Sequence, residues 1–277
     1  MSDSTSKFEK HVFVDKENIT LIDHLHESLP EFSKAKLKKI LQSGAVWLTE
    51  RKSTVRVRRS KRVLKKGSEI HLYYDESVLN QVVDSAILVA DEVGFSVWNK
   101  PKGMFSQGTK WGDANSICRW VEVNGFPDRP VYQVHRLDRA TGGLILVAHK
   151  KSIASQLISL FENRKVAKHY HAVVEGIFPA IKIIDDEVDG KSAKTIVLQS
   201  EIIKANNQTR LIVSIETGRK HQIRKHLAGL GHPIVGDRMY NENSENAGFL
   251  LDLQLESIYL KFQLAEQERI YEIKINA

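Results

Sequence analysis

The sequence predicts an α+β protein built from two unequal domains. The chain has 277 residues, enough for one large domain or for two domains of different size. Its β-like stretches are short and numerous, and its helical stretches are too few for regular βαβ alternation, which favours a largely antiparallel or mixed sheet. An acidic connection at residues 75–85 follows a compact basic segment. We therefore expect a small domain at residues 18–75 and a larger one at residues 87–277.

The overall composition is that of a folded protein. Hydrophobic residues make up 42% of the chain and charged residues 27%, which excludes intrinsic disorder as the main state. A single cysteine, Cys118, excludes an internal disulfide framework and a cysteine-rich zinc site. Neither a signal-peptide pattern nor an apolar run of about 18 residues is present. We therefore expect a cytoplasmic monomer that does not associate with membranes.

Positive charge is concentrated in one segment. Residues 32–67 contain 13 lysines and arginines and one acid, a net charge of +12, and the rest of the chain carries −5. Concentration of this kind suits a polyanionic partner. A solvated, self-repelling surface or an unstructured binding tail is the alternative. Patterned apolar residues within the segment favour a folded nucleic-acid-binding domain.

The small domain is expected to contain two helices and a small sheet, after a loose segment at residues 1–14. Apolar residues at helical spacing over 21–29 predict a helix that ends before Pro30. Ser33 suits the N-cap of a second helix, and Gly44 suits its end. The candidate nucleic-acid contacts are lysines off the apolar face of that helix and arginines that share one side of a strand: Lys34, Lys38, Arg56 and Arg58. Strands are expected at 45–48, 55–58 and 69–74.

In the larger domain, hydrophobic periodicity predicts several strands and two clear helices. The strands are expected at 87–90, 95–98, 144–148 and 170–174, and the helices at 152–162 and 222–230.

Residues 134–144 form the first segment with chemical potential. Asp138 lies between two arginines and is followed by Thr-Gly-Gly and an apolar strand. Glycines beside a strand let a substrate approach the backbone closely. A carboxylate held among cations stays ionised near neutral pH, as a nucleophile must. Taken alone, the pattern more often describes a salt bridge in a turn.

Two further segments supply cations and rings. Lys168 and Tyr170 are two residues apart on an expected strand, so they would face the same way, as stacking on a base beside its phosphate requires. A core tyrosine with a surface lysine is the alternative. Residues 216–226 place several cationic and imidazole side chains beside a glycine turn that opens a helix, which suits a phosphate or an anionic side chain.

Four ordered motifs give the chain a clear resemblance to the RluA-type pseudouridine synthases. His135-Arg136-Leu137-Asp138 with Thr141-Gly142, and the run from Thr217 to His226 that continues to Asp237, are highly specific. Lys168-His169-Tyr170 and the Asn99–Gly103 run add support. In front of them, residues 18–75 resemble the S-four-type (alpha-L) RNA-binding module, through the runs 22–29, 33–37, 44–46 and 64–70.

The resemblance implies an isomerase that converts uridine to pseudouridine in structured RNA. Asp138 would be the nucleophile, attacking either the anomeric carbon or the base. Arg224 would pair with Asp138, and Tyr170 would pack against the base and help remove the proton from carbon five. Arg136 would fill the gap left by the flipped nucleotide. Lys168 and Ile223 would shape the pocket, and the remaining expected RNA contacts are Arg219, His221 and Gln222.

The same resemblance implies that no cofactor is needed, because the base leaves and returns within one site. No metal site is expected either. His169 and His171 alternate along a strand, and His221 and His226 are five apart rather than at the i, i+4 spacing of a helical zinc pair. The remaining histidines form no constellation in the sequence.

The expected partner is RNA, with large-subunit ribosomal RNA favoured and transfer RNA second. One competing interpretation is a ribosome-associated RNA chaperone without catalysis, although such a protein would have no need of Asp138. Another is metal-independent RNA cleavage by His135 and His221, which lack a spacing typical of an acid–base pair.

Overall fold

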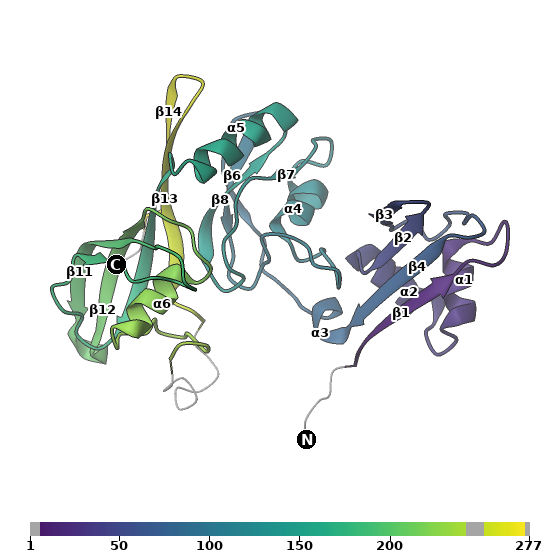
Figure 1. The fold of residues 1–277 in the computed structure, drawn as a ribbon, viewed down its shortest axis with the longest axis horizontal. Helices are drawn as coiled ribbons and strands as arrows, with labels where there is room; N and C mark the ends of the chain where they lie inside the picture. The colour runs from purple at the N-terminus through teal and green to yellow at the C-terminus, as the bar shows by residue number, and fades with distance from the viewer. Residues whose placement is uncertain (1–5, 242–251, 275–277) are drawn as a thin grey trace. The chain divides into compact units, whose positions relative to one another are not determined.

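The computed structural model describes residues 6–241 and 252–274, so residues 242–251 and 275–277 of the expected larger domain lie outside the described residues. The chain forms two compact units, drawn in Figure 1. The first, here called the N-terminal unit, comprises Met1–Val82 and Gln107–Trp120. The second comprises Val83–Ser106 and Val121–Ala277 and is called the catalytic unit because it contains the residues expected to be catalytic. Residues 107–120 thus differ from the sequence-based expectation, which places them in the larger domain. Among the described residues, no helix is both long and apolar enough to cross a membrane.

The N-terminal unit is a four-stranded antiparallel sheet with two helices on one face (Figure 1). Phe8, on the first strand, packs against Phe32 and Tyr74, so residues that were expected to be loose form an edge strand instead. In sheet order the strands are β1 (Lys7–Phe13), β4 (Glu69–Asp75), β2 (Val46–Glu50) and β3 (Ser53–Arg56). The helices are α1 (Leu21–Ser28) and α2 (Lys34–Ser43), followed after the sheet by the short α3 (Glu76–Leu79).

The ends of α2 follow directly from its sequence. The Ser33 hydroxyl accepts a hydrogen bond from the Lys36 amide at 3.2 Å, which makes Ser33 the predicted N-cap. Gly44 ends the helix with a φ of +78°, a left-handed conformation that favours glycine. Between these ends, Leu37, Ile40 and Leu41 are buried against the sheet and α1.

Residues 107–120 complete the N-terminal unit. The Asp113 amide donates to the Ser43 carbonyl at the end of α2, and the Asp113 carboxylate pairs with Arg58 and, at 3.0 Å, with Arg56. A Cβ on Gly44 would lie 2.4 Å from a carboxylate oxygen of Asp113, so the glycine also makes room for this contact. The segment ends in α4 (Ile117–Trp120).

The catalytic unit is built on a ten-stranded mixed sheet, in which only β8 and β13 pair in parallel among the described strands. It confirms the predicted α+β class with a mostly antiparallel sheet. The main path runs β10 (Ile183–Ile184), β11 (Thr195–Ile203), β12 (Gln208–Ile215), β9 (Ala167–Glu175), β13 (Leu255–Leu264), β8 (Gly142–Ala148), β6 (Phe95–Lys100) and β5 (Ile87–Asp91). β14 (Gln267–Glu272) pairs with β13, and β7 (Tyr132–Gln133) pairs with β8.

Two helices pack against this sheet, one around β8 and the other beside β11. α5 (Lys151–Glu162) contacts β8, β7 and β13, and its buried Ala154 and Leu157 join the core of that half. α6 (Gln222–Gly229) lies beside β11, as Figure 1 shows. A single π-helical turn (Val121–Gly125) and a 3₁₀ turn (Lys204–Asn206) complete the described elements of the unit.

The middle of the sheet determines where the site forms. β13 lies between β8 and β9, and its Ser257 is paired with Gly143 on one side and with Tyr170 on the other. Gly143 has a φ of +102°, and a Cβ there would lie 2.1 Å from the Ser257 carbonyl oxygen. Only glycine permits this approach, which brings the residues just before β8 close to Tyr170.

Candidate active site

The loop that carries Asp138 is fixed by hydrogen bonds to its backbone. The Asp138 carbonyl accepts from the Thr141 amide at 3.0 Å, which forms a tight turn before β8. Ser106 is buried; its hydroxyl donates to the Leu137 carbonyl at 2.7 Å and accepts from the Leu137 amide at 2.9 Å. The Gly103 amide donates to the Arg139 carbonyl. The backbone on both sides of Asp138 is therefore held by the segment that follows β6.

Lys100, at the end of β6, lies beneath the same loop and is completely buried. Its ammonium donates to the carbonyls of Met104 at 2.8 Å, Pro101 at 3.1 Å and Arg139 at 3.5 Å. Burial lowers the pKa of Lys100 to about 7, although the negative charge of Asp138 acts in the opposite direction. Lys100 therefore links two backbone segments while supplying positive charge near Asp138.

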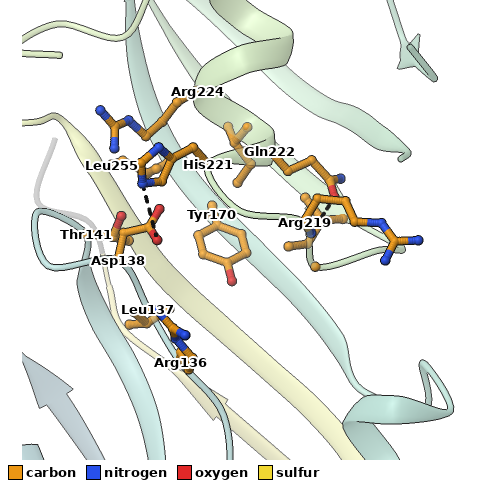
Figure 2. Close-up of a pocket in the computed structure, with 13 residues that line it drawn as sticks. Arg136, Leu137, Asp138, Thr141, Tyr170, Arg219, His221, Gln222, Arg224 and Leu255 are labelled. Carbon is orange, nitrogen blue, oxygen red and sulfur yellow. Dashed lines mark hydrogen bonds and ion pairs between the residues drawn. The ribbon is translucent and has the colours of Figure 1, made fainter. Parts of the chain in front are cut away.

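Asp138 faces a cleft formed by residues from β9, β12 and the start of α6. Its side chain remains 30% exposed, so a substrate can reach the carboxylate. The cleft consists of two hollows that share Asp138 and Tyr170. The larger hollow, which the α6 residues do not line, has a volume of about 530 Å³, within the range of roughly 300–1,000 Å³ found for ligand pockets. Figure 2 shows the Tyr170 ring at the centre of the site, between Asp138 and Arg219.

Tyr170 is buried and presents its ring to the cleft. Burial raises the pKa of its phenol, and the nearby charge of Asp138 raises it further. The phenol therefore stays protonated at neutral pH, which opposes the expected role in removing a proton from carbon five. Lys168 is also buried and lies on the same face of β9, as the alternation predicted. Burial, with the nearby Arg164, lowers the pKa of Lys168.

The expected direct pairing of Arg224 with Asp138 is wrong in this structure. The Arg224 guanidinium is 5% exposed and makes two hydrogen bonds to Asp237, at 2.6 and 2.7 Å. Burial acts to lower the pKa of Arg224, but the bonds to Asp237 outweigh it and the charge of Asp138 adds to their effect, so the pKa is raised. Asp237 is fully buried and is the nearer carboxylate available to satisfy a buried arginine. Arg224 therefore acts on Asp138 through its field.

Asp138 has an imidazole as its partner instead of a guanidinium. The Nε2 of His221 lies 3.8 Å from Asp138 Oδ1, drawn as a dashed line in Figure 2. His221 precedes α6 in a left-handed conformation, and its Nδ1 is 2.9 Å from the Tyr240 hydroxyl. Burial lowers the pKa of His221, against the effect of Asp138, so the ring is mainly neutral at pH 7.

The Gln222 side chain connects the turn before α6 to residues 194–195, and its amide is not available to RNA. Its carbonyl oxygen accepts from the Thr217 hydroxyl at 2.6 Å and from the Arg219 amide at 3.1 Å. Its amide nitrogen donates to the Lys194 carbonyl and the Thr195 hydroxyl on the β11 side. The expectation of an RNA contact is therefore corrected, because all the polar atoms of this buried side chain already have partners.

The other predicted residues of this unit line the cleft. Ile223 is buried in its wall, and Arg136 is exposed at its edge with no ion pair among the described residues. Arg219 is half-buried, and its side chain donates to the Ser192 carbonyl at 3.1 Å. Arg136 and Arg219 are thus the predicted arginines of this wall that can still meet a phosphate, and the exposed Arg164 lines the same cleft.

His135 does not form an acid–base pair with His221. Its Nε2 accepts a hydrogen bond from the Leu146 amide at 2.9 Å, and its ring stacks on Phe161 at 4.3 Å. Burial, with a smaller effect of Lys168, lowers the pKa of His135 to about 3. A ring that stays neutral and has its Nε2 engaged by the backbone cannot exchange protons with RNA, which opposes the interpretation as an RNA-cleaving enzyme.

In the N-terminal unit, the predicted RNA contacts divide into two groups. Lys38 is exposed without an ion pair among the described residues, and Lys34 is exposed but paired with Asp23 at 2.6 Å. Arg56 and Arg58 are only 16% and 23% exposed and are paired with Asp113. The expectation that these two arginines face RNA is corrected, because both are mostly buried against Asp113, which comes from a distant part of the chain.

Several residues that build these sites carry no clear signal in the sequence. Lys100 stands within a recognised motif, but nothing in the sequence shows its burial. Ser106 and Asp113 belong to a segment without a motif, and no local signal identifies their partners. Asp237 closes the recognised run after Gly236, and an acid at its end could have been considered as a partner for Arg224.

The sequence of the catalytic unit is similar to those of known RNA-modifying enzymes. Residues 94–229 match the family model for RNA pseudouridylate synthase. The chain is 32% identical over 189 residues to tRNA pseudouridine synthase C of Vibrio cholerae, covering 59% of this chain and 77% of that protein. It is 27% identical over 235 residues to ribosomal large subunit pseudouridine synthase D of Haemophilus influenzae, covering 78% of this chain and 71% of that protein.

The fold has a counterpart among solved structures. Human RNA pseudouridylate synthase domain containing 1 superposes with a TM-score of 0.59 and 23% identity, covering 70% of this chain and 85% of that one. The family match extends across the Asp138 loop, Tyr170 and α6, which carry most of the residues that line the cleft. The chain belongs to the RluA family of RNA pseudouridine synthases, which are isomerases.

Proposed function

We propose that this chain isomerises specific uridines of large-subunit ribosomal RNA, with Asp138 as the nucleophile. The observation that supports this most strongly is an accessible carboxylate that faces a cleft beside the buried ring of Tyr170. The hydrogen bonds from Ser106 and Thr141 fix the loop, so the carboxylate has a defined position before the substrate arrives.

The reaction conserves all atoms of the RNA. Asp138 attacks the anomeric carbon or the base, and the bond between that carbon and N1 breaks. The uracil turns within the cleft and a bond forms between the anomeric carbon and carbon five. The bond between the Asp138 oxygen and the carbon it attacked breaks, which restores the free carboxylate, and the proton on carbon five is lost while N1 gains one. Either point of attack requires an ionised carboxylate.

The surrounding residues have complementary roles in this proposal. Tyr170 packs its ring against the target base, because its phenol stays protonated and its ring forms a wall of the cleft. Arg136, exposed at the cleft edge, takes the place of the flipped nucleotide in the RNA stack. Lys168 and Ile223 shape the pocket, and Arg219 contacts phosphate.

The choice of ribosomal RNA over transfer RNA depends on the N-terminal unit. The match to the ribosomal enzyme covers 78% of the 277 residues, which is about 216 residues. The expected larger domain, residues 87–277, contains only 191, so at least about 25 matched residues precede it. The match to the transfer RNA enzyme covers 59%, which that domain alone can contain. We infer that the basic N-terminal unit is an RNA anchor of the S-four type for a large RNA. Transfer RNA is the second candidate.

The nucleophile is tested with Asp138→Asn. We expect this variant to bind RNA as the wild type does and to form no pseudouridine, measured as tritium release from RNA labelled at carbon five of uridine. Asp128→Asn, an exposed acid of the same unit, is the matched control and should keep full activity. Pseudouridine formation by Asp138→Asn would overturn the assignment, and shortened RNA products would indicate cleavage.

The substrate is tested by mapping pseudouridines in total RNA from cells with and without the gene. We expect sites to disappear from large-subunit ribosomal RNA and to return when wild-type protein is supplied, but not when Asp138→Asn is supplied. Loss confined to transfer RNA would replace the proposed substrate with the second candidate. No change in any RNA would favour a non-catalytic RNA-binding protein.

A further inference from the structure

Two histidines and a glutamate converge on the sheet face of the N-terminal unit that the helices leave open. His11 on β1 lies directly opposite His71 on β4, and Glu69 lies two residues before His71, so all three point to the same face. The neighbouring Ile70 and Leu72 point to the other face and join the hydrophobic core. The sequence predicts no constellation among these histidines, because 60 residues separate the two.

The donor atoms are close enough to share one ion. The Nδ1 atoms of His11 and His71 are 2.7 Å apart, and Glu69 Oε1 lies 3.9 Å from each. One ligand atom from each residue lies within 4.8 Å of the others. Around a tetrahedral zinc ion with bonds of about 2.0–2.1 Å, donor atoms are separated by about 3.3–3.4 Å, between the two distances seen here.

The remaining adjustment is small. The His11 side chain is 45% exposed and can rotate, whereas His71 is only 14% exposed and is fixed on the sheet. A modest turn of His11 would separate the two nitrogens and admit an ion while Glu69 completes the third position. Three protein ligands would leave the fourth position for water.

The second nitrogen of His71 has a hydrogen-bonded oxygen partner that directs Nδ1 inward, and the second nitrogen of His11 has a carboxylate in its vicinity. His71 Nε2 is 2.7 Å from the Thr49 hydroxyl, which is itself 2.7 Å from the Thr54 hydroxyl. His11 Nε2 lies 3.9 Å from Glu9 Oε2. Oxygen partners of this kind orient the ring and select the free nitrogen in histidine-ligated metal sites.

We propose that His11, His71 and Glu69 bind one divalent ion of the zinc class. Two imidazoles and one carboxylate are the donors zinc accepts, whereas calcium and magnesium prefer oxygen ligands throughout. Two facing Nδ1 atoms need one proton between them when no ion is bound, and an ion at this position replaces that proton.

The bound ion would fasten the edge strand to the sheet. β1 has mostly exposed side chains, and its chief apolar anchor is the partly buried Phe8. A ligand from β1 and two from β4 would add a cross-strand link at the middle of this pairing. The site lies outside the residues assigned to catalysis, so its role is to hold the N-terminal unit together.

The test uses the untagged full chain with zinc chloride or cobalt chloride as the probe. Calorimetry should find one zinc ion per chain, and cobalt should give the visible absorption of a four-coordinate site. His71→Ala should weaken binding at least about tenfold, and Glu69→Gln should do so without removing an aromatic ring. His26→Gln, which changes a histidine bonded to the Phe32 carbonyl, is the matched control and should bind as the wild type does.

A second readout separates binding from folding. Zinc should slow amide hydrogen exchange in residues 7–13 of the wild type several-fold and have no such effect in Glu69→Gln, provided circular dichroism shows both to be folded. Equal zinc affinity in the wild type and in both ligand variants would overturn the proposal. Absence of one-to-one binding by the folded wild type would reduce the cluster to a hydrogen-bonded histidine pair and would also overturn it.

Discussion

Lys100 shows how one side chain can support a reaction that it does not touch. It is a completely buried lysine whose hydrogen bonds go to backbone carbonyls, one of them in the residue after Asp138. Because a buried ammonium is costly, the same interaction that orders the loop makes this part of the fold sensitive to pH. The sequence places Lys100 in a recognised motif without revealing this position.

The pH dependence of stability follows from the pKa of Lys100. The folded value of about 7 lies below the ordinary value of 10.5, so between these pH values the unfolded chain binds a proton that the folded chain does not. Burial of Lys100 therefore destabilises the folded state most below pH 7. The free energy of unfolding of the wild type should rise from pH 7 to pH 10.

Lys100→Met is the variant that isolates this effect, measured by urea unfolding of the RNA-free protein. From pH 7 to pH 10, the free energy of unfolding of the wild type should increase by a few kcal/mol more than that of this variant, since each pKa unit corresponds to about 1.4 kcal/mol. The variant should also turn over more slowly, because the Asp138 loop loses its link to Met104. Parallel pH curves for the two proteins would refute this account.

At the scale of elements, the parallel pairing of β8 with β13 brings the loop that carries Asp138 beside Tyr170. Gly143→Ala would place a Cβ against backbone atoms of Ser257 that cannot rotate away. We expect the free energy of unfolding to fall by about 3 kcal/mol or more, together with loss of activity.

The adjacent Gly142→Ala is the matched control for that prediction. Its Cβ would lie 3.4 Å from the Lys100 carbonyl oxygen and from the Lys102 side chain, and its φ is not in the left-handed region. The free energy of unfolding should change by about 1 kcal/mol or less, measured by chemical denaturation. Similar destabilisation of both variants would show that the β8–β13 approach is not the cause.

Elements were predictable where their signals are local. The Ser33 cap and Gly44 terminus of α2 follow from neighbouring residues, and the runs that form β6 and β8 are apolar enough to identify. β1 was not predicted because most of its side chains are exposed, so its pairing with β4 leaves only a weak apolar pattern in the sequence.

The site was predictable to a similar extent. Asp138, Tyr170 and Lys168 line one cleft as the motifs implied. The predicted partner of Arg224 was wrong, because charge complementarity alone cannot choose between Asp138 and Asp237. Likewise the partner of Arg58 is 55 residues away at Asp113, and only the folded chain brings the two together.

At the scale of the whole molecule, the positive charge identified in the sequence separates into structural and available parts. Arg56 and Arg58 share the single carboxylate of Asp113, whereas Lys38, Lys39 and Arg59 are among the cations of this unit that are exposed without ion pairs in the described residues. We expect the second group to supply the phosphate contacts of the N-terminal unit.

Replacing Lys38, Lys39 and Arg59 together by glutamine tests this assignment. Each cation that binds a phosphate should contribute about 0.7–0.9 to the slope of log affinity against log salt, so removing three should make the slope shallower by about 2. The matched control replaces exposed lysines of the catalytic unit, Lys151, Lys182 and Lys204, and changes the net charge equally. Fluorescence anisotropy over a salt series measures the RNA affinity of both triple variants. Equal slopes for the two would contradict the prediction.

The N-terminal unit contains two separate segments of the chain, so cleavage of one peptide bond cannot separate the two units. The polypeptide passes from one unit to the other at 82/83, 106/107 and 120/121. A protease that nicks the connection near residue 83 would leave two fragments still associated, because Asp113 and its neighbours stay bound to residues 43–58. Conversely, a gene shortened to begin at residue 83 would encode residues 107–120 without the surface that orders them, directly beside the Ser106 that holds the nucleophile loop. Loss of activity in such a truncation would therefore report a damaged catalytic unit as well as a missing RNA anchor.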